Sequence, residues 1–339
     1  MKKLELTFAM TPYDRIQPLI SGEVQPQGIS LHYVDLPVPD IFYQQLKFNR
    51  FDISEMSLSL FLIARANGWS YRLLPIYHNH QFVYSRLVVH ADSGIRTPED
   101  LKRKRMGVFD YQQSGALWLR GQLRHEFGVH PEDIEWYMER APRYSLAGAA
   151  GGFQPPAGLT FHYASTDLAT MFLQGQLDAG FGILPHGGGA ALERPKQDLS
   201  NHPKLKKLFP EPRKEAIRYY QKNGFVPIHH TTVVRESILS EHPWVALSLL
   251  EAFEEAKRIA IGESRRYPAL ASLFLFGREE LEEQRKIFGE DPFPYGIKAN
   301  AKAFGLLQTY SVEQGLTARM QPWDELFAEE ILIAEERLP

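Results

Sequence analysis

The sequence of 339 residues contains no cysteine. This absence excludes disulfide bonds, thiolate metal sites and a cysteine nucleophile, and it fits a reducing compartment. A long apolar run is also missing, since no stretch approaches the 18 residues of a membrane-spanning helix. The N-terminal segment MKKLELTFAMTPYD alternates and lacks the continuous apolar core of a signal peptide. We therefore expect a cytoplasmic protein without a membrane anchor.

A strong charge of one sign is absent as well. The formal net charge is -3, with 38 basic and 41 acidic residues mixed along the chain. Such a balance creates no field that attracts nucleic acid or an anionic membrane. The sequence has no Walker motif and no dinucleotide fingerprint, and its run HGGG lacks the GxSxG partner of an esterase. We expect neither nucleic acid nor a membrane as a partner.

The residues that are present predict an α/β protein large enough for two lobes, with 44% hydrophobic and 12% aromatic content. Alternating patterns and capping residues predict strands and helices in turn, which favours parallel-rich sheets. Residues 205–208 are predicted to be helical. The Gly-rich segments at 147–152 and 187–189 are predicted to be loops. Strands are expected at 4–9, 29–34, 51–56, 71–76, 105–109, 134–138, 159–163 and 178–184.

Two long extended stretches, 82–90 and 225–235, bracket a segment with its own strands and helices. This arrangement predicts an inserted lobe joined by two crossing strands. Residues 1–90 and 232–339 would form lobe 1, and residues 91–231 would form lobe 2. A ligand would then bind between the lobes, at the carboxyl ends of the strands.

The segment KRMGVFDYQQSGALWLRG, residues 104–121, reads as a strand, a polar turn and a helix. Free N–H groups and the positive end of the helix dipole at Ser114 favour an anionic ligand group. The alternative is that Ser114 only caps the helix. A second strand-to-helix turn, which includes Ser54 and Glu55, is also dense in polar groups. We expect the two turns to face one ligand.

Four histidines fall at the predicted lobe junctions: His78, His80, His229 and His230. The first two lie in a segment, 77–81, that we expect to interrupt a strand. Because side chains alternate along a strand, only one of His229 and His230 is expected to face the cleft. An alternative is a divalent-metal site made by His78, His80 and His230 with a carboxylate such as Glu55.

Arg86 lies within the predicted crossing strand. Burying an arginine without a partner is costly, so we expect Arg86 to bind a ligand or to pair with an acid.

Several phrases resemble the 4,5-dihydroxyphthalate decarboxylase family, in order along nearly the whole chain. They are TPYDR, FDISEMSLS, RTPEDLKRKRMGVFDYQQSGALWLRG, GVHPEDIEW, GFVPIHHTTVVRESILSEHPWVALSLLEAFEEAK, FGEDPFPYGIKAN and YSVEQGLT. That family is similar to solute-binding proteins of ABC transporters. The resemblance implies a two-lobed type II periplasmic-binding-protein-like fold, an enzyme that removes one carboxyl group from a dihydroxylated aromatic diacid, and a homo-oligomer. It implies site roles for Tyr13, Arg15, Ser54, Glu55, Tyr111, Gln112 and His230.

The resulting hypothesis is a decarboxylase in which a general acid protonates the ring carbon. His230 is the favoured donor, with His78 and His80 as alternates, and Glu55 belongs to the same catalytic group. Arg15, Arg86 and Ser114 would hold carboxylate, while Tyr13, Ser54, Tyr111 and Gln112 would orient the ring and its hydroxyls. We expect no cofactor, with one divalent metal ion as the alternative. The competing hypothesis is a non-catalytic solute-binding protein for a small organic anion.

Overall fold

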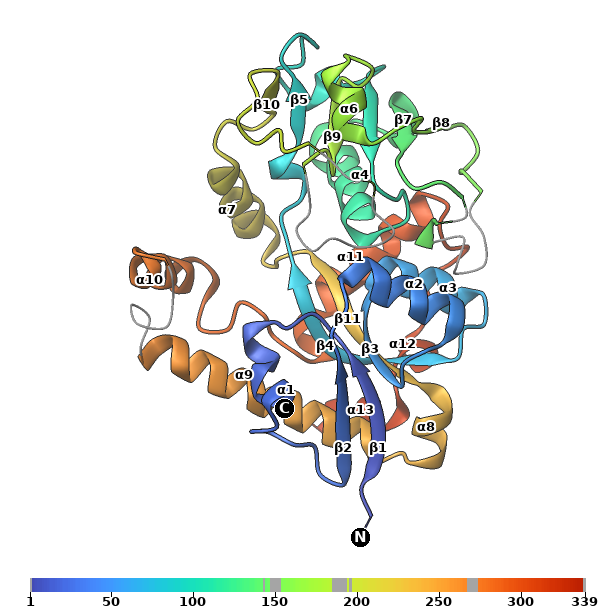
Figure 1. Cartoon of the computed structure of the whole chain (residues 1–339), viewed down its shortest axis with the longest axis vertical. Coiled ribbons are helices and arrows are strands. Elements are labelled where there is room, and N and C mark those ends of the chain that lie inside the picture. The colour runs from blue at the N-terminus through green and yellow to red at the C-terminus, as the bar shows by residue number, and fades with distance from the viewer. Residues whose placement is uncertain are drawn as a thin grey trace.

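The computed structural model describes residues 2–142, 144–146, 154–184, 194, 197–266 and 274–337. The two predicted Gly-rich loops, 147–152 and 187–189, lie outside these residues. Figure 1 shows two lobes, one above the other, each built on its own sheet. No described helix is long and apolar enough to cross a membrane.

The lower lobe contains a sheet in the order β2-β1-β3-β11-β4. β1, β2 and β3 run parallel, and β11 lies antiparallel between β3 and β4. The apolar alternation of the N-terminal segment thus forms the predicted first strand, with Phe8 and Ala9 fully buried. The strands are β1 (Leu4–Ala9), β2 (Ile29–Val34), β3 (Ile53–Ser57), β4 (Tyr71–His80) and β11 (Ile228–Arg235).

The upper lobe contains a second sheet in the order β10-β5-β9-β6-β7-β8. β9, β6, β7 and β8 are parallel, whereas β5 is antiparallel to its neighbours β9 and β10. The carboxyl ends of the parallel strands therefore share one edge of the sheet. The strands are β5 (Val88–His90), β6 (Arg105–Val108), β7 (Glu135–Met138), β8 (Thr160–Tyr163), β9 (Ala179–Phe181) and β10 (Leu205–Lys207).

Helices cover both sheets. Asp167 caps the start of one of them by accepting a hydrogen bond from the N–H of Thr170. The helices of the described residues are α1 (Gln17–Ser21), α2 (Val38–Phe48), α3 (Leu58–Ala66), α4 (Ser114–Phe127), α6 (Leu168–Leu173), α7 (Pro212–Asn223), α8 (Glu236–Glu241), α9 (Val245–Arg266), α10 (Gly277–Phe288), α11 (Ile297–Glu313), α12 (Trp323–Leu326) and α13 (Glu329–Arg337), with short 3-10 helices η1 (Asp14–Ile16), η2 (Tyr84–Arg86), η3 (Pro98–Leu101) and η4 (Pro131–Asp133).

Three local predictions are wrong. The stretch 82–90 is not one extended strand, because η2 and then β5 occupy it. β4 is not interrupted at 77–81: a register shift against β11 accommodates Pro75, which has no N–H to donate, and the strand continues to His80. Residues 205–207 form a strand and not a helix, since they pair with the edge of β5. Strand pairing overrode the local pattern in the second and third cases.

The chain passes from one sheet to the other within two connecting segments, 81–87 and 224–227. β5 thus belongs to the upper sheet although it precedes the predicted boundary at 90, and all of β11 belongs to the lower sheet although part of it precedes 232.

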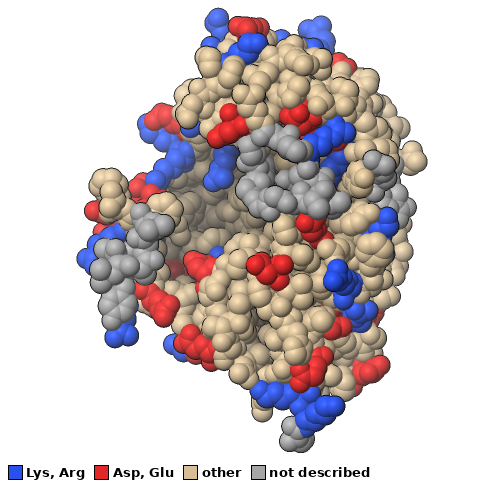
Figure 2. All heavy atoms as spheres, in the orientation of Figure 1, with Lys and Arg blue, Asp and Glu red and all other residues tan. Residues whose placement is uncertain are grey.

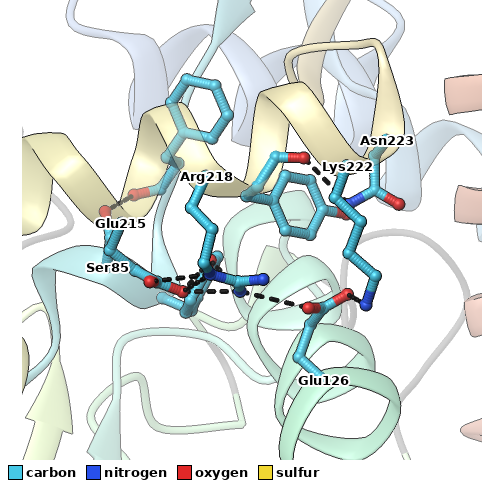
Figure 3. A network of polar contacts seen from close by, with 9 residues as sticks. Ser85, Glu126, Glu215, Arg218, Lys222 and Asn223 are labelled. Atoms are coloured by element: carbon cyan, nitrogen blue, oxygen red, sulfur yellow. Dashed lines mark hydrogen bonds and ion pairs between the residues drawn. The ribbon is translucent and has the colours of Figure 1, made fainter.

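A polar network braces the connection on the upper side. In Figure 3, Arg218 and Lys222 of α7 both reach Glu126 at the end of α4, at 3.1 and 2.9 Å. Glu215 accepts hydrogen bonds from Arg218 and from the hydroxyl of Tyr84 in η2, at 2.7 and 2.6 Å. These contacts tie α7 to α4 and to the segment between the lobes.

Candidate active site

The centre of the site is an ion pair between neighbouring strands of the lower sheet. Glu55 lies in the middle of β3 with no solvent exposure, and its Oε1 is 2.6 Å from Nδ1 of His230 on β11. The hydroxyl of Tyr13 donates to the same carboxylate oxygen at 2.7 Å, and the N–H of Thr11 donates to the other at 2.9 Å. Both of these residues lie in the loop after β1. The carboxylate is therefore surrounded by donors.

These donors decide the charge of Glu55. Burial alone would raise its pKa, but the hydrogen bond and charge of His230, with the N–H of Thr11, lower the pKa to about 2. An ionised carboxylate only accepts hydrogen bonds, so Nδ1 of His230 carries a hydrogen. Nε2 of His230 is then the ring nitrogen that remains for a ligand, and the side chain is 16% exposed.

The other junction histidines are held neutral. Burial lowers the pKa of each of His78, His80 and His229 to about 3. His78 bonds Thr232 through Nε2 at 2.6 Å and stacks against Tyr13. Near neutral pH these three histidines are therefore uncharged, and they are poor proton donors.

The described residues offer no ligand cluster for the alternative metal site. Within the described residues, no three or more His, Cys, Asp or Glu side chains are placed to hold a metal ion. His78 bonds Thr232, and His80 packs edge-on against Phe293 at a centroid distance of 5.3 Å. The two rings thus point to different neighbours and do not join His230.

A second polar feature joins the lobes where two helices begin. Ser57 precedes α3, and Ser114 is the first residue of α4. The N–H of Ser114 donates to Ser57 Oγ at 3.2 Å, and the N–H of Ser59 donates to Ser114 Oγ at 3.0 Å. Each hydroxyl oxygen therefore accepts from the first turn of the opposite helix. The two hydroxyls lie 2.9 Å apart and share one hydrogen bond, which leaves one hydroxyl hydrogen for a ligand.

Both features open onto one cavity of about 590 Å3. Its size suits a single-ring ligand, and its wall combines apolar and polar side chains. Among the apolar residues are Phe42, Phe109 and Phe181, and Phe42 meets the ring of His230 edge-on at 5.0 Å. The polar wall residues include Ser57, Asn79, Gln81, Gln113, Ser114, Arg140, His229 and His230.

Two of the predicted site residues, His230 and Ser114, line this cavity. The expectation that only one of His229 and His230 faces it is wrong, because both line it. The pairing of β11 with β4 shifts register between Ile228 and His230, so strict alternation fails at His229. Glu55 and Tyr13 lie one layer behind His230, through the contacts given above.

The remaining predicted residues lie elsewhere. Ser54 is buried on the opposite face of β3 from Glu55. Arg15 is buried behind the site, where its guanidinium donates to the carbonyl of His78 and lies over Phe293. Tyr111 is buried in the upper core, with Arg120 over its ring at 3.5 Å, and Gln112 is buried beside it without lining the cavity.

Arg86 is neither buried nor in a strand. It is exposed in η2 and lines a separate groove of about 770 Å3 between α7 and α10. Figure 2 shows the surface hollowed on this side, between the arm that carries α10 and the lobes. The prediction that Arg86 binds a ligand or pairs with an acid assumed that its side chain is buried. It therefore does not apply to this exposed residue.

The sequence reasoning missed Asn79, Gln81 and Arg140. Arg140 follows β7, whose carboxyl end lies at the same edge of the upper sheet as that of β6. A polar residue just after a predicted strand is the signal that would have found it. Asn79 and Gln81 were passed over because the end of β4 was taken for a break.

Comparisons with known proteins show which sequences this chain resembles. A family model described as the periplasmic substrate-binding protein of a phosphonate ABC transporter matches residues 23–183. A 4,5-dihydroxyphthalate decarboxylase from Comamonas testosteroni is 31% identical over 336 residues, 96% of this chain and 97% of that protein. One from Pseudomonas putida is 30% identical over 228 residues, 65% of this chain and 83% of that protein.

Solved structures share the fold at low identity. The alkanesulfonate-binding protein SsuA from Xanthomonas axonopodis pv. citri, bound to MOPS, superposes with a TM-score of 0.54 at 14% identity over 98% of both chains. The desulfurization enzyme DSZB gives 0.53 at 14% identity, covering 98% of this chain and 99% of that one. The predicted two-lobed periplasmic-binding-protein fold is confirmed.

Proposed function

The chain belongs to the 4,5-dihydroxyphthalate decarboxylase family, and on this premise we propose that it removes one carboxyl group, without oxidation, from a hydroxylated aromatic diacid such as 4,5-dihydroxyphthalate. One observation carries the proposal: His230, paired with buried Glu55 at 2.6 Å, lies in the wall of the cavity between the lobes. A carboxylate-backed imidazole is a suitable general acid near neutral pH.

The reaction follows from the position of that acid. The imidazolium of His230 donates the proton on Nε2 to the ring carbon that bears the departing carboxylate. In 4,5-dihydroxyphthalate this carbon lies para to a hydroxyl, which delocalises the resulting positive charge. The bond to the carboxylate then breaks, its electron pair restores the aromatic ring, and carbon dioxide leaves. His230 is left neutral and takes up a proton from solvent, so one proton replaces one carboxylate overall.

The walls around His230 favour loss of charge. Phe42 packs against the imidazole, and Phe109 and Phe181 also line the cavity. A carboxylate among such rings is poorly solvated, so its conversion to neutral carbon dioxide is favourable. The amides of Asn79 and Gln81, with the spare hydrogen of the Ser57 and Ser114 hydroxyls, offer hydrogen bonds to the polar groups of the substrate. We propose that no cofactor takes part.

The test is carbon dioxide release from hydroxylated phthalates and benzoates, with and without a chelator. His230→Ala and Glu55→Gln should each lower kcat on the order of 10²- to 10⁴-fold, because the first removes the proton donor and the second removes the charge that supports it. His125→Gln is the matched control: His125 is a half-exposed histidine of α4 that pairs with Glu313, and its loss should leave kcat unchanged.

Full activity in His230→Ala would refute the donor assignment. Loss of activity with a chelator, restored by a divalent metal, would refute the cofactor-free mechanism. If the wild-type protein binds aromatic acids and releases no carbon dioxide from any of them, the non-catalytic solute-binding alternative takes the place of the enzyme.

A further inference from the structure

A second groove lies between α7 of the upper lobe and α10 of the arm, and its volume is about 770 Å3. Figure 2 shows this side of the molecule as a hollow between the arm and the lobes, with basic side chains at its upper edge. Among the described residues, the groove and the cavity that contains His230 share no wall residue. The proposed decarboxylation therefore leaves this groove without a role.

The groove has apolar walls along two helices. Ala216 and Ile217 of α7 line it, as do Ile287 and Phe288 of α10, and all four side chains are partly exposed. The ring of Phe288 stacks on Phe82 in the segment between the lobes, at a centroid distance of 6.1 Å. Every residue of α10 is at least partly exposed, so the apolar side of this helix faces the groove and not a closed core.

Two cations of the groove are not balanced by acids. Arg86 and Lys207 both line it and are exposed, and neither forms an ion pair with another residue that the structure describes. The pairing of β10 with β5 places Lys207 opposite Val88, two residues after Arg86. The two cations therefore come from adjacent segments of the upper lobe.

The acid in the described part of the wall is already paired. Glu280 of α10 accepts a hydrogen bond from Arg213 of α7 at 2.8 Å, and Arg213 also lies 2.9 Å from Glu283. These contacts join α7 to α10 and balance the charge of Arg213. The charges of Arg86 and Lys207 remain, which gives the groove an excess of positive charge.

An anion with a long apolar tail fits this combination. Its head group would neutralise the two cations, and its tail would cover apolar surface that water otherwise contacts. The wall residues of α10 extend from Glu280 to Phe288, about 12 Å along the helix at a rise of about 1.5 Å per residue. An extended chain of about ten carbons, with C–C bonds of about 1.5 Å, has a similar length.

We propose that this groove is a second ligand site, which binds a medium-chain aliphatic carboxylate with its head group at Arg86 and Lys207 and its tail between α7 and α10. Arg86 thus binds a ligand because of the groove around it, and not because of the burial that the sequence led us to expect. The site is independent of the proposed decarboxylase activity. Its occupant links the arm to the upper lobe.

The test is titration calorimetry of the full chain with decanoate. We expect one decanoate per chain, and octanoate and hexanoate should bind more weakly, by up to about fourfold for each CH2 that is removed. Decyltrimethylammonium has the same tail with the opposite charge and should not bind.

Substitutions separate the head group from the tail. The double variant Arg86→Met/Lys207→Met should weaken decanoate binding on the order of tenfold, and both side chains are exposed, so their loss should leave the fold intact. Lys206→Met is the matched control, because Lys206 is exposed on the same strand and does not line the groove.

The tail has its own pair of variants. Ile287→Gln should weaken decanoate binding by about fivefold, because it replaces part of the apolar wall. Ile333→Gln is the control, since Ile333 of α13 is 42% exposed and lies outside the groove.

Three results would overturn the inference. The first is wild-type affinity for decanoate in Arg86→Met/Lys207→Met, or no decanoate binding at all. The second is displacement of decanoate by phthalate, which would place the tail in the cavity of His230. The third is a dimer in analytical ultracentrifugation that binds no decanoate and dissociates in Ile287→Gln, since the groove would then be an interface between two copies of the chain.

Discussion

Burial, and not residue type, separates His78 and His229 from His230 at the junction of the lobes. His78 and His229 are almost completely buried, which lowers the pKa of each to about 3 and keeps both rings neutral. His230 is part-exposed and has the ionised carboxylate of Glu55 beside it. The same side chain thus serves packing at some positions and acid–base chemistry at one, and the difference lies in the neighbours.

The buried histidines make stability depend on pH. Their pKa near 3 in the folded protein lies below the unfolded value near 6.5, so the unfolded chain binds more protons between these limits. The free energy of unfolding should therefore fall as pH drops below about 6.5, by about 1.4 kcal/mol per pH unit for each such histidine. His229→Gln should make the slope shallower by about that amount. The measurement is urea unfolding between pH 7 and pH 5, and an unchanged slope would contradict the prediction.

At the scale of elements, α4 connects the cavity wall to the core of the lower lobe. It begins at Ser114 in the cavity wall, and further along it Leu117 and Trp118 are buried in the core of the lower lobe. The indole N–H of Trp118 donates to the carbonyl of Ile228 on β11 at 2.7 Å. α4 thus follows a strand of one lobe and packs in the core of the other. Its position fixes Ser114 relative to His230.

Gly121 permits this packing. A Cβ built at this residue would lie 2.0 Å from the ring of Tyr310 on α11, so any side chain forces the two helices apart. Gly121→Ala should lower the free energy of unfolding by about 1 to 3 kcal/mol. Gly262→Ala is the control, since Gly262 of α9 has open space around its Cβ and should gain about 0.5 to 1 kcal/mol from helix propensity. Chemical denaturation measures both, and equal effects would contradict the close-packing argument.

At the scale of the whole molecule, two sheets with separate cores are joined by two short segments and by α4. Apolar side chains of α4 belong to the lower core, while Leu119 and Leu123 of the same helix belong to the upper one. Since one helix contributes to both cores, neither lobe is complete without the other. The cavity wall, drawn from both lobes, is therefore held together by the same helix.

The two lobes should consequently unfold together. Thermal or urea unfolding should show a single transition, with the same midpoint by tryptophan fluorescence and by circular dichroism. Gly121→Ala should move both curves by the same amount, because it acts on the shared helix. Two separate transitions, or a shift in only one signal, would show that the lobes are independent units.

The sequence by itself determined the order of the elements and the strand–turn–helix at 105–127. Apolar periodicity, capping residues and chain-breaking prolines act over a few neighbouring residues, so they can be read without the fold. It also placed Ser114 and the pair His229 and His230 at one cleft, because the starts of helices and the junctions between lobes are features that a two-lobed α/β fold gathers in one place. The resemblance to the family, and not the local pattern, selected His230 from the pair.

Only the tertiary structure decided which side chains reach the cavity. Tyr111 and Arg140 both follow a predicted strand of the upper sheet, yet the ring of Tyr111 packs into the core beneath Arg120 while Arg140 lines the cavity. The register shift that lets His229 join His230 arises from pairing with a strand about 150 residues earlier in the chain. Such choices depend on burial and on contacts between distant segments, which a linear pattern does not contain.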